Sequence, residues 1–237
     1  MIEDILNLLR HNPYPGRGII IGRSEDNTRS IAVYFIMGRS QNSRNRVFVR
    51  TEDGIKTKAY DPAAMSDPSL VIYHPVRLCY GSAIITNGDQ TDTIHKYLTN
   101  GHDFRKALLT RQFEPDHPNY TPRISGIMKP DGGYCLSILK TLNGDPDSCC
   151  RYFFEYPTPL PGLGHFISTY KTDGDPLPSF EGEPIPVGLT VADGIGAYAK
   201  SIWGALNEEN KVSLYAQETF LSTGESQNII INKWELV

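Results

Sequence analysis

Short segments rich in β-branched and aromatic residues follow one another closely along this chain, and most are separated only by turns of hairpin length. This spacing leaves little room for the crossover helices of a parallel sheet, so neighbouring strands are expected to pair antiparallel. Strands are predicted at residues 17–22, 29–38, 46–51, 69–74, 77–86, 123–128, 134–140, 151–156, 165–171, 211–218 and 228–235. Helices are predicted at residues 2–11, 92–99, 104–113 and 192–207.

These elements predict an α+β fold in which two antiparallel sheets pack face to face with the helices outside, a four-layer αββα sandwich. The 237 residues suit one large domain or two small ones. The sequence contains neither an internal repeat nor a low-complexity tract, and we expect a single domain spanning residues 1–237. A proline-rich stretch at 173–188 is expected to form a surface loop.

Several features of the chain predict a cytoplasmic protein without a membrane partner. The first ten residues, MIEDILNLLR, are acidic and amphipathic and lack the apolar core of a signal peptide. No apolar run approaches the length of a membrane span. The four cysteines form no CxxC pair, and the adjacent Cys149 and Cys150 are poorly suited to a structural disulfide. Such cysteine usage is typical of a reducing compartment.

Basic residues are concentrated at the start of the chain. The first 50 residues hold eight arginines and four acidic residues, and no lysine precedes Lys56, whereas the whole chain has a net charge of −4. Arginine presents a planar fork of donors that suits phosphate and carboxylate groups. This segment therefore favours a small anionic ligand over nucleic acid, which requires a broad basic surface; a solvated basic face is the alternative. The candidate contacts are Arg17, Arg23, Arg39, Ser40, Arg44 and Arg46.

Three further motifs each allow a functional and a structural interpretation. TNGDQTD at 86–92 follows a strand and enters a helix, where backbone amides bind anions or carbonyl oxygens, but it also fits a plain turn. NYTPRIS at 119–125 places Arg123 at the entry of a strand, facing either a cleft or solvent. SLVIYHPVRL at 69–78 places Tyr73 near Arg77, whose charge favours a phenolate, but a buried core tyrosine is the alternative.

Common cofactor and metal motifs are missing from the sequence. There is no GxxxxGK[ST] and no GxSxG, and GIGAYA at 194–199 does not follow a strand of a βαβ unit. The six histidines show no spacing typical of metal ligands. We expect no metal and no cofactor.

The segments YPGRGIIIGR, GRSQNSRNR, TNGDQTDTI, TPRISG and GHFISTY occur in this order over about residues 14–205. Their order and spacing resemble the archaeal-type inosine monophosphate (IMP) cyclohydrolase family. The resemblance implies a fold like that of N-terminal-nucleophile hydrolases. It also implies the last step of purine synthesis, in which 5-formamidoimidazole-4-carboxamide ribonucleotide closes its ring and loses water to give IMP. The implied partner is a purine ribonucleotide.

The resemblance also implies roles for particular residues. Tyr73 matches the tyrosine of the family's Tyr-Asn bend and is the candidate for proton transfer, although His74 replaces the asparagine. Asn87 and the backbone of Gly88 are candidates to hold the carboxamide or the oxyanion, and Arg123 to position the base or the phosphate.

An acid–base partner is needed as well, and Glu114 or Asp116 is the candidate, in a segment, FEPDHPNY, that departs from the family pattern. The remaining candidates for substrate contact are Arg77, Thr91 and Asp92.

Two other functions remain as alternatives. One is a non-catalytic nucleotide-binding relative that keeps the arginines. The other is an amide hydrolase with an N-terminal nucleophile, which requires Cys, Ser or Thr at the mature first position, whereas Met1 here precedes Ile2. The family resemblance further suggests a homo-oligomer, either a tetramer or a dimer.

Overall fold

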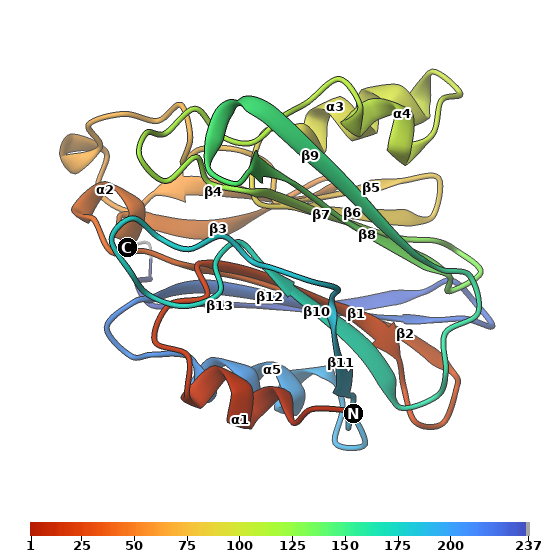
Figure 1. Ribbon diagram of the computed structural model, residues 1–237. Helices are drawn as coiled ribbons and strands as arrows, with labels where there is room; N and C mark the ends of the chain where they lie inside the picture. Colours follow the sequence, from red (N-terminus) through yellow and green to blue (C-terminus); the bar gives the residue numbers. More distant parts are fainter. Residues whose placement is uncertain (236–237) are drawn as a thin grey trace.

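Two antiparallel sheets and a small number of helices make up the fold, which a computed structural model describes for residues 1–235 (Figure 1). The six-stranded sheet runs in the order β11 (Ile185–Gly188), β10 (Leu163–Ser168), β1 (Arg17–Arg23), β2 (Arg29–Met37), β12 (Lys211–Phe220) and β13 (Ser226–Asn232). The seven-stranded sheet follows chain order: β3 (Arg46–Thr51), β4 (Gly54–Ala59), β5 (Val76–Cys79), β6 (Ser82–Thr86), β7 (Arg123–Met128), β8 (Tyr134–Leu142) and β9 (Asp145–Tyr156). The predicted α+β class with antiparallel sheets is confirmed.

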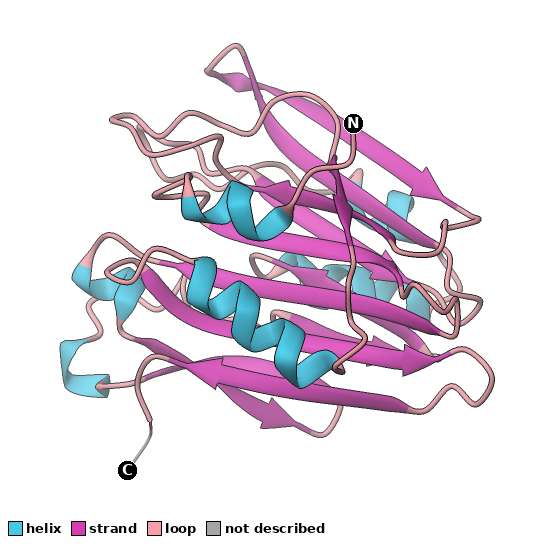
Figure 2. Ribbon diagram, turned by 90° about the horizontal axis from the view of Figure 1, so that it is seen from below, coloured by secondary structure: helices cyan, strands magenta, loops and turns pink. Residues whose placement is uncertain are grey.

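The helices lie on the outer faces of the two sheets. Figure 1 shows α1 (Ile5–Arg10) and α5 (Ile195–Ala205) below the six-stranded sheet, and Figure 2 shows them lying across its strands. On the opposite side of the molecule, α3 (Gln90–Thr99) and α4 (Phe104–Leu108) cover the seven-stranded sheet. The short α2 (Gln41–Arg44) and the 3₁₀ helix η1 (Pro62–Ala64) lie in connections. No helix within residues 1–235 is long and apolar enough to cross a membrane.

Each layer boundary is filled by its own apolar core. On β1, Ile20 joins the core beneath α1 and α5, while Ile19 and Ile21 join the core between the sheets. A third core lies between the seven-stranded sheet and the α3–α4 pair and includes Ile84 and Leu108. The central strands β1 and β2 are therefore buried on both faces, and they show no alternation of apolar and polar residues.

The structure corrects several predicted boundaries. The predicted strand at 69–74 is wrong, because backbone groups of this proline-flanked segment bond locally, as in Ile72 N–H to Pro68 O at 2.9 Å. The predicted strand at 77–86 is the hairpin β5–β6, whose turn residues Tyr80 and Gly81 both have positive φ. The strands β4 and β11 and the helix α2 were not predicted, and α4 ends earlier than the predicted helix at 104–113.

Antiparallel pairing brings the starts of some strands and the ends of others to one end of the sandwich. On the six-stranded sheet, Arg17 at the start of β1 pairs with Ile36 near the end of β2. On the other sheet, β7 begins at Arg123, close to the end of β6. The connection through α2 links β2 to Arg46 at the start of β3 in the second sheet. Three arginines from both sheets therefore reach the same end of the fold.

Candidate functional site

A cluster of charged and phenolic side chains is buried at this end of the sandwich. Arg46 is fully buried, Glu114 is 2% exposed, and Arg17 and Arg123 retain 8% and 6% exposure. The charge of Glu114 acts on Arg17, and those of Arg17, Arg123 and Arg46 act on Glu114, so the four groups share one electrostatic environment. We call these four residues the charged cluster.

Several polar atoms of the charged cluster lack a hydrogen-bond partner within the part of the chain that the structure describes. Nη1 and Nη2 of Arg46, Nε of Arg17, Nε of Arg123 and Oε1 of Glu114 are buried without a hydrogen-bond partner among residues 1–235. Arg46 is held only through Nε, which donates to Ser43 O at 2.8 Å. Unpaired buried polar groups are unfavourable and rare in folded proteins. Three guanidinium groups with free donors are an arrangement suited to an anionic ligand rich in acceptors.

Two tyrosines lie beside the charged cluster. The hydroxyl groups of Tyr34 on β2 and Tyr73 are 2.8 Å apart, and both side chains are buried. Tyr73 is fixed by Thr57 on β4, because its N–H donates to Thr57 Oγ1 at 2.8 Å. Burial raises the pKa of Tyr34 well above its ordinary value, and the neighbouring Tyr73 adds to this effect. The pair can pass a proton between its hydroxyls next to the guanidinium groups.

Glu114 combines burial with positive surroundings. Its loop is fixed by the backbone bond from Glu114 N–H to Thr121 O at 2.9 Å. Burial raises the pKa of its carboxyl group to about 7, and Arg17 and Arg123 offset only part of that rise. A carboxyl group with this proton affinity can accept and return a proton near neutral pH.

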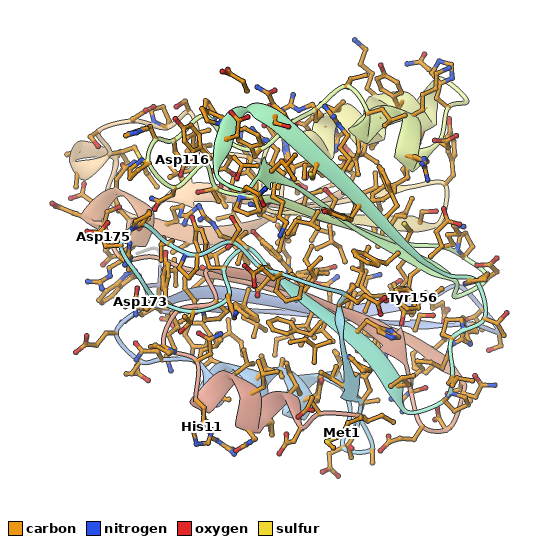
Figure 3. All side chains as sticks on the ribbon, in the orientation of Figure 1. Met1, His11, Asp116, Tyr156, Asp173 and Asp175 are labelled. Atoms are coloured by element: carbon orange, nitrogen blue, oxygen red, sulfur yellow. The ribbon has the colours of Figure 1, made fainter. Side chains whose placement is uncertain are left out.

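Asp116, the other predicted acid–base candidate, has a different environment. Its carboxylate accepts from the backbone N–H of Thr121 at 2.6 Å and also from the Thr121 hydroxyl. The Thr121 hydroxyl is in turn 2.6 Å from Tyr170 OH. Asp116 therefore holds the loop that carries Glu114, and Figure 3 shows it at the left-hand end of the molecule together with Asp173 and Asp175.

The segment between β6 and α3 borders the charged cluster. Asn87 donates from Nδ2 to Pro122 O at 2.9 Å and accepts at Oδ1 from Ile124 N–H at 2.8 Å, so its amide joins this turn to the start of β7. A Cβ atom on Gly88 would lie 2.5 Å from Nη1 of Arg123. The glycine therefore lets the backbone approach Arg123, while the Asn87 side chain is engaged in holding the turn.

The other two candidates from this segment lie beyond the cluster. Thr91 is buried, and its hydroxyl donates to Gly88 O at 3.1 Å within the helix start. Asp92 forms an ion pair at 3.0 Å with Arg77, which also pairs with Asp53 at 2.6 Å. The side chain of Thr91 bonds to Gly88 and Thr86 in the turn before α3, and Asp92 and Arg77 pair along the border of α3 with β5, so none of the three bonds directly to a described member of the charged cluster.

Arg23 lies far from the charged cluster. It shares the inward face of β1 with Arg17, but it lies six residue steps further along the strand, which is about 20 Å. Its guanidinium contacts Asn27 at 3.4 Å and lies near Tyr134, which stacks on Tyr156 at the right-hand end of Figure 3. The structure therefore separates Arg23 from the other candidates.

Most polar residues of the GRSQNSRNR segment stabilise the local backbone, and one belongs to the charged cluster. Ser40 caps α2 by accepting from Ser43 N–H at 3.1 Å. Arg44 donates to Gly38 O and to Asn210 Oδ1, both at 2.9 Å, and so fixes the turn after β2. Of this segment, only Arg46 enters the charged cluster.

Arg39 occupies the edge of the site. Its guanidinium lies over the ring of Tyr14 at 5.2 Å, and Tyr14 is close enough to Arg17 and Arg46 to influence both. Nη1 of Arg39 donates to Asp173 Oδ1 at 2.6 Å and to Gly174 O at 2.9 Å. Arg39 thus joins the border of the site to the loop that follows β10.

Sequence reasoning missed several residues of the site. Tyr34 lies within a strand whose residues are almost all buried, so no periodicity distinguishes it from its apolar neighbours. Gln90 accepts from Arg123 at 2.6 Å, yet it looks like an ordinary first residue of a helix. Tyr14 and Tyr170 stack at 5.9 Å although 155 residues separate them. Only the tertiary fold reveals such pairs.

The fold and the charged cluster define an α+β protein with a solvent-shielded, arginine-rich centre between the ends of two antiparallel sheets. The chain belongs to the IMP cyclohydrolase-like protein family, whose sequence model matches residues 14–221 and thus every member of the charged cluster. The resemblance found from the motifs is confirmed.

Curated relatives carry the name IMP cyclohydrolase. The protein of Methanopyrus kandleri is 31% identical over 189 residues, which cover 71% of this chain and 89% of the relative. That of Halobacterium salinarum is 27% identical over 172 residues, with coverage of 71% and 78%. That of Methanococcus aeolicus is 25% identical over 162 residues, with coverage of 67% and 74%.

Proposed function

We propose that this protein is an IMP cyclohydrolase that closes the ring of 5-formamidoimidazole-4-carboxamide ribonucleotide with loss of water. Family membership supports the reaction class. The observation that carries the proposal is the set of unpaired buried donors on Arg17, Arg46 and Arg123 around Glu114. A ribonucleotide monophosphate supplies acceptors for these donors, and the reaction itself needs a group that exchanges protons near neutral pH.

The arginines bind and orient the substrate. Arg46 offers both terminal nitrogens and Arg17 its Nε, an arrangement that suits the oxygens of a phosphate or a carboxamide. Arg39 extends this positive surface toward the edge of the site. Holding the carboxamide nitrogen against the formyl carbon makes the attack intramolecular in effect, and orientation of this kind lowers a barrier by several kcal/mol.

Ring closure then requires two proton transfers. The carboxamide nitrogen attacks the formyl carbon, a C–N bond forms, and the formyl oxygen departs as water. The carboxamide nitrogen loses one of its two hydrogens, the formamido nitrogen loses its single hydrogen, and the departing oxygen gains both. Glu114 accepts a proton from the carboxamide nitrogen, and the Tyr73–Tyr34 hydroxyl pair supplies a proton to the oxygen. The guanidinium of Arg123, whose Nε has no partner among the described residues, stabilises the negative charge that develops on that oxygen.

The broader description of the molecule is part of the same proposal. The four layers support an N-terminal-nucleophile-hydrolase-like architecture, although Met1 followed by Ile2 supplies no N-terminal nucleophile. We propose a single domain over residues 1–237, a cytoplasmic location and a homo-oligomeric assembly.

The test is direct conversion of the formamido ribonucleotide by the purified protein, followed by chromatography of IMP. Wild-type protein is expected to form IMP, and Arg46→Met to lose most of the affinity for IMP measured by calorimetry. Binding of IMP without turnover would identify a non-catalytic nucleotide-binding relative. Failure to bind IMP or the substrate would refute the proposal. An intact mass of about 26.5 kDa would rule out internal cleavage of the kind that exposes a new N-terminal nucleophile.

A further inference from the structure

Asp89 stands at the start of α3 but does not cap that helix. Aspartate at this position usually accepts a hydrogen bond from a backbone N–H of the first turn, which contributes about 1 kcal/mol. Here the carboxylate makes no such bond. It turns instead toward two arginines: Nη2 of Arg111 lies 2.6 Å from each of its oxygens, and Nη1 of Arg123 lies 2.7 Å from Oδ1.

Within residues 1–235, the guanidinium group of Arg123 is consequently held through Nη1. Nη1 contacts Asp89 Oδ1 and donates to Gln90 Oε1 at 2.6 Å, and Gly88 leaves the space that this nitrogen occupies. Nε has no partner among residues 1–235. The guanidinium is thus anchored through Nη1, while Nε stays without a partner among the described residues.

Arg123 differs in this respect from the other arginines of the charged cluster. Of the three arginines in the charged cluster, Arg123 is the one that forms an ion pair with a carboxylate among the described residues, at 2.7 Å to Asp89. The groups that face Glu114 are Arg17 from β1, Arg46 from β3, Arg123 from β7 and Asp116 from its own loop. Of these, Arg123 is the one whose placement depends on a half-exposed carboxylate outside the cluster.

We propose that Asp89, oriented by Arg111, is a positioning residue that fixes Arg123 so that its unpaired Nε is available to Glu114 and the substrate. This inference rests on the proposed ring closure for its catalytic consequence, but the placement of Arg123 can be tested without turnover. In this proposal Asp89 acts through Arg123 and not through a contact of its own with the substrate.

The charge of Arg123 lowers the pKa of Glu114 against the effect of burial. When Arg123 loses its anchor, Glu114 loses part of that stabilisation, and its pKa rises further. A base that must be deprotonated then works only at higher pH. Removal of Asp89 should therefore shift the acid limb of the pH profile of kcat/KM upward, which a purely structural role would not do.

The experiment compares Asp89→Ala and Asp89→Asn with Glu208→Ala, an exposed carboxylate that also pairs with a basic side chain, Lys211, and forms no ion pair with a described member of the charged cluster. Asp89→Ala is expected to lower kcat/KM at pH 7 by about tenfold, with partial recovery at higher pH and an unchanged unfolding temperature. Asp89→Asn retains an acceptor for Arg123 and should fall between Asp89→Ala and wild type. Glu208→Ala should behave like wild type.

A double-mutant cycle identifies the path of the effect. If Asp89 acts through Arg123, the Asp89→Ala change should matter little in an Arg123→Met background. Multiplicative losses in the double variant would overturn the proposal. The pKa of Glu114 can also be measured without substrate, from the pH dependence of its carboxyl band in infrared difference spectra that use Glu114→Gln as the reference. An unshifted band in Asp89→Ala would overturn the positioning role, whereas absence of IMP formation by wild type would overturn only the proposed function.

Discussion

Replacing Glu114 by glutamine should stabilise the unliganded protein at neutral and alkaline pH. The folded-state pKa of about 7 lies above the ordinary value of 4.5, so the fold binds the proton more tightly than the unfolded chain does. Stability contributed by the protonated form is complete below about pH 4.5 and is lost as pH rises to about 7. The difference between these pKa values corresponds to a decrease of about 3 kcal/mol in the free energy of unfolding once the pH exceeds about 7. Glutamine has the shape of the neutral carboxylic acid but does not ionise, so the variant keeps this stability as the pH rises.

Urea denaturation at intervals between pH 4 and pH 8 measures the effect. Wild type and Glu114→Gln should have nearly equal free energies of unfolding at pH 4, and the variant should be more stable by up to about 3 kcal/mol at pH 8. Glu181→Gln, an exchange at an exposed carboxylate, is the control and should follow wild type throughout. A variant less stable than wild type at pH 8 would refute the reasoning, because Glu114 would then be a stabilising partner of Arg17. Ring closure should meanwhile fall by at least about 100-fold.

Four further substitutions probe other parts of the site. Tyr73→Phe removes the hydroxyl from the tyrosine pair and should lower kcat by about 100-fold while reducing unfolding free energy by only about 1 kcal/mol; near wild-type turnover would remove Tyr73 from the mechanism. Gly88→Ala places a methyl group 2.5 Å from Nη1 of Arg123 and should cost about 1–3 kcal/mol in urea denaturation together with most of the activity. Asp173→Asn should free Arg39 and lower KM, whereas Arg39→Ala should raise KM about tenfold with little change in kcat; equal KM values would exclude Arg39 from substrate contact.

Hairpin-length spacing was sufficient to predict antiparallel sheets and helices outside them, because short connections leave few topologies. Strand β4 was missed although its Lys56 and Lys58 alternate with the buried Ile55 and Thr57, since it follows β3 after a two-residue turn. The pairing of β1 with β10, which brings Gly18 beside Ser168, depends on contacts between residues far apart in the chain, and no local pattern encodes it.

The site was predictable where a motif placed an unusual residue at the start of a strand. Arg17, Arg46 and Arg123 all begin strands, and all three reach the charged cluster. Arg23 has the same strand parity as Arg17 but lies at the opposite end of β1, and the guanidinium of Arg44 is engaged by the turn after β2. Composition alone could not separate these two groups.

Arg17 belongs to one sheet, and Arg46 and Arg123 belong to the other. A nucleotide bound by all three arginines would link the two sheets at this end of the sandwich, in addition to the apolar core that already joins them. Bound product or substrate should consequently slow backbone hydrogen exchange in β1 and β7 together, even though these strands lie in different sheets and form no hydrogen bonds with each other. The melting temperature should also rise with the logarithm of the ligand concentration.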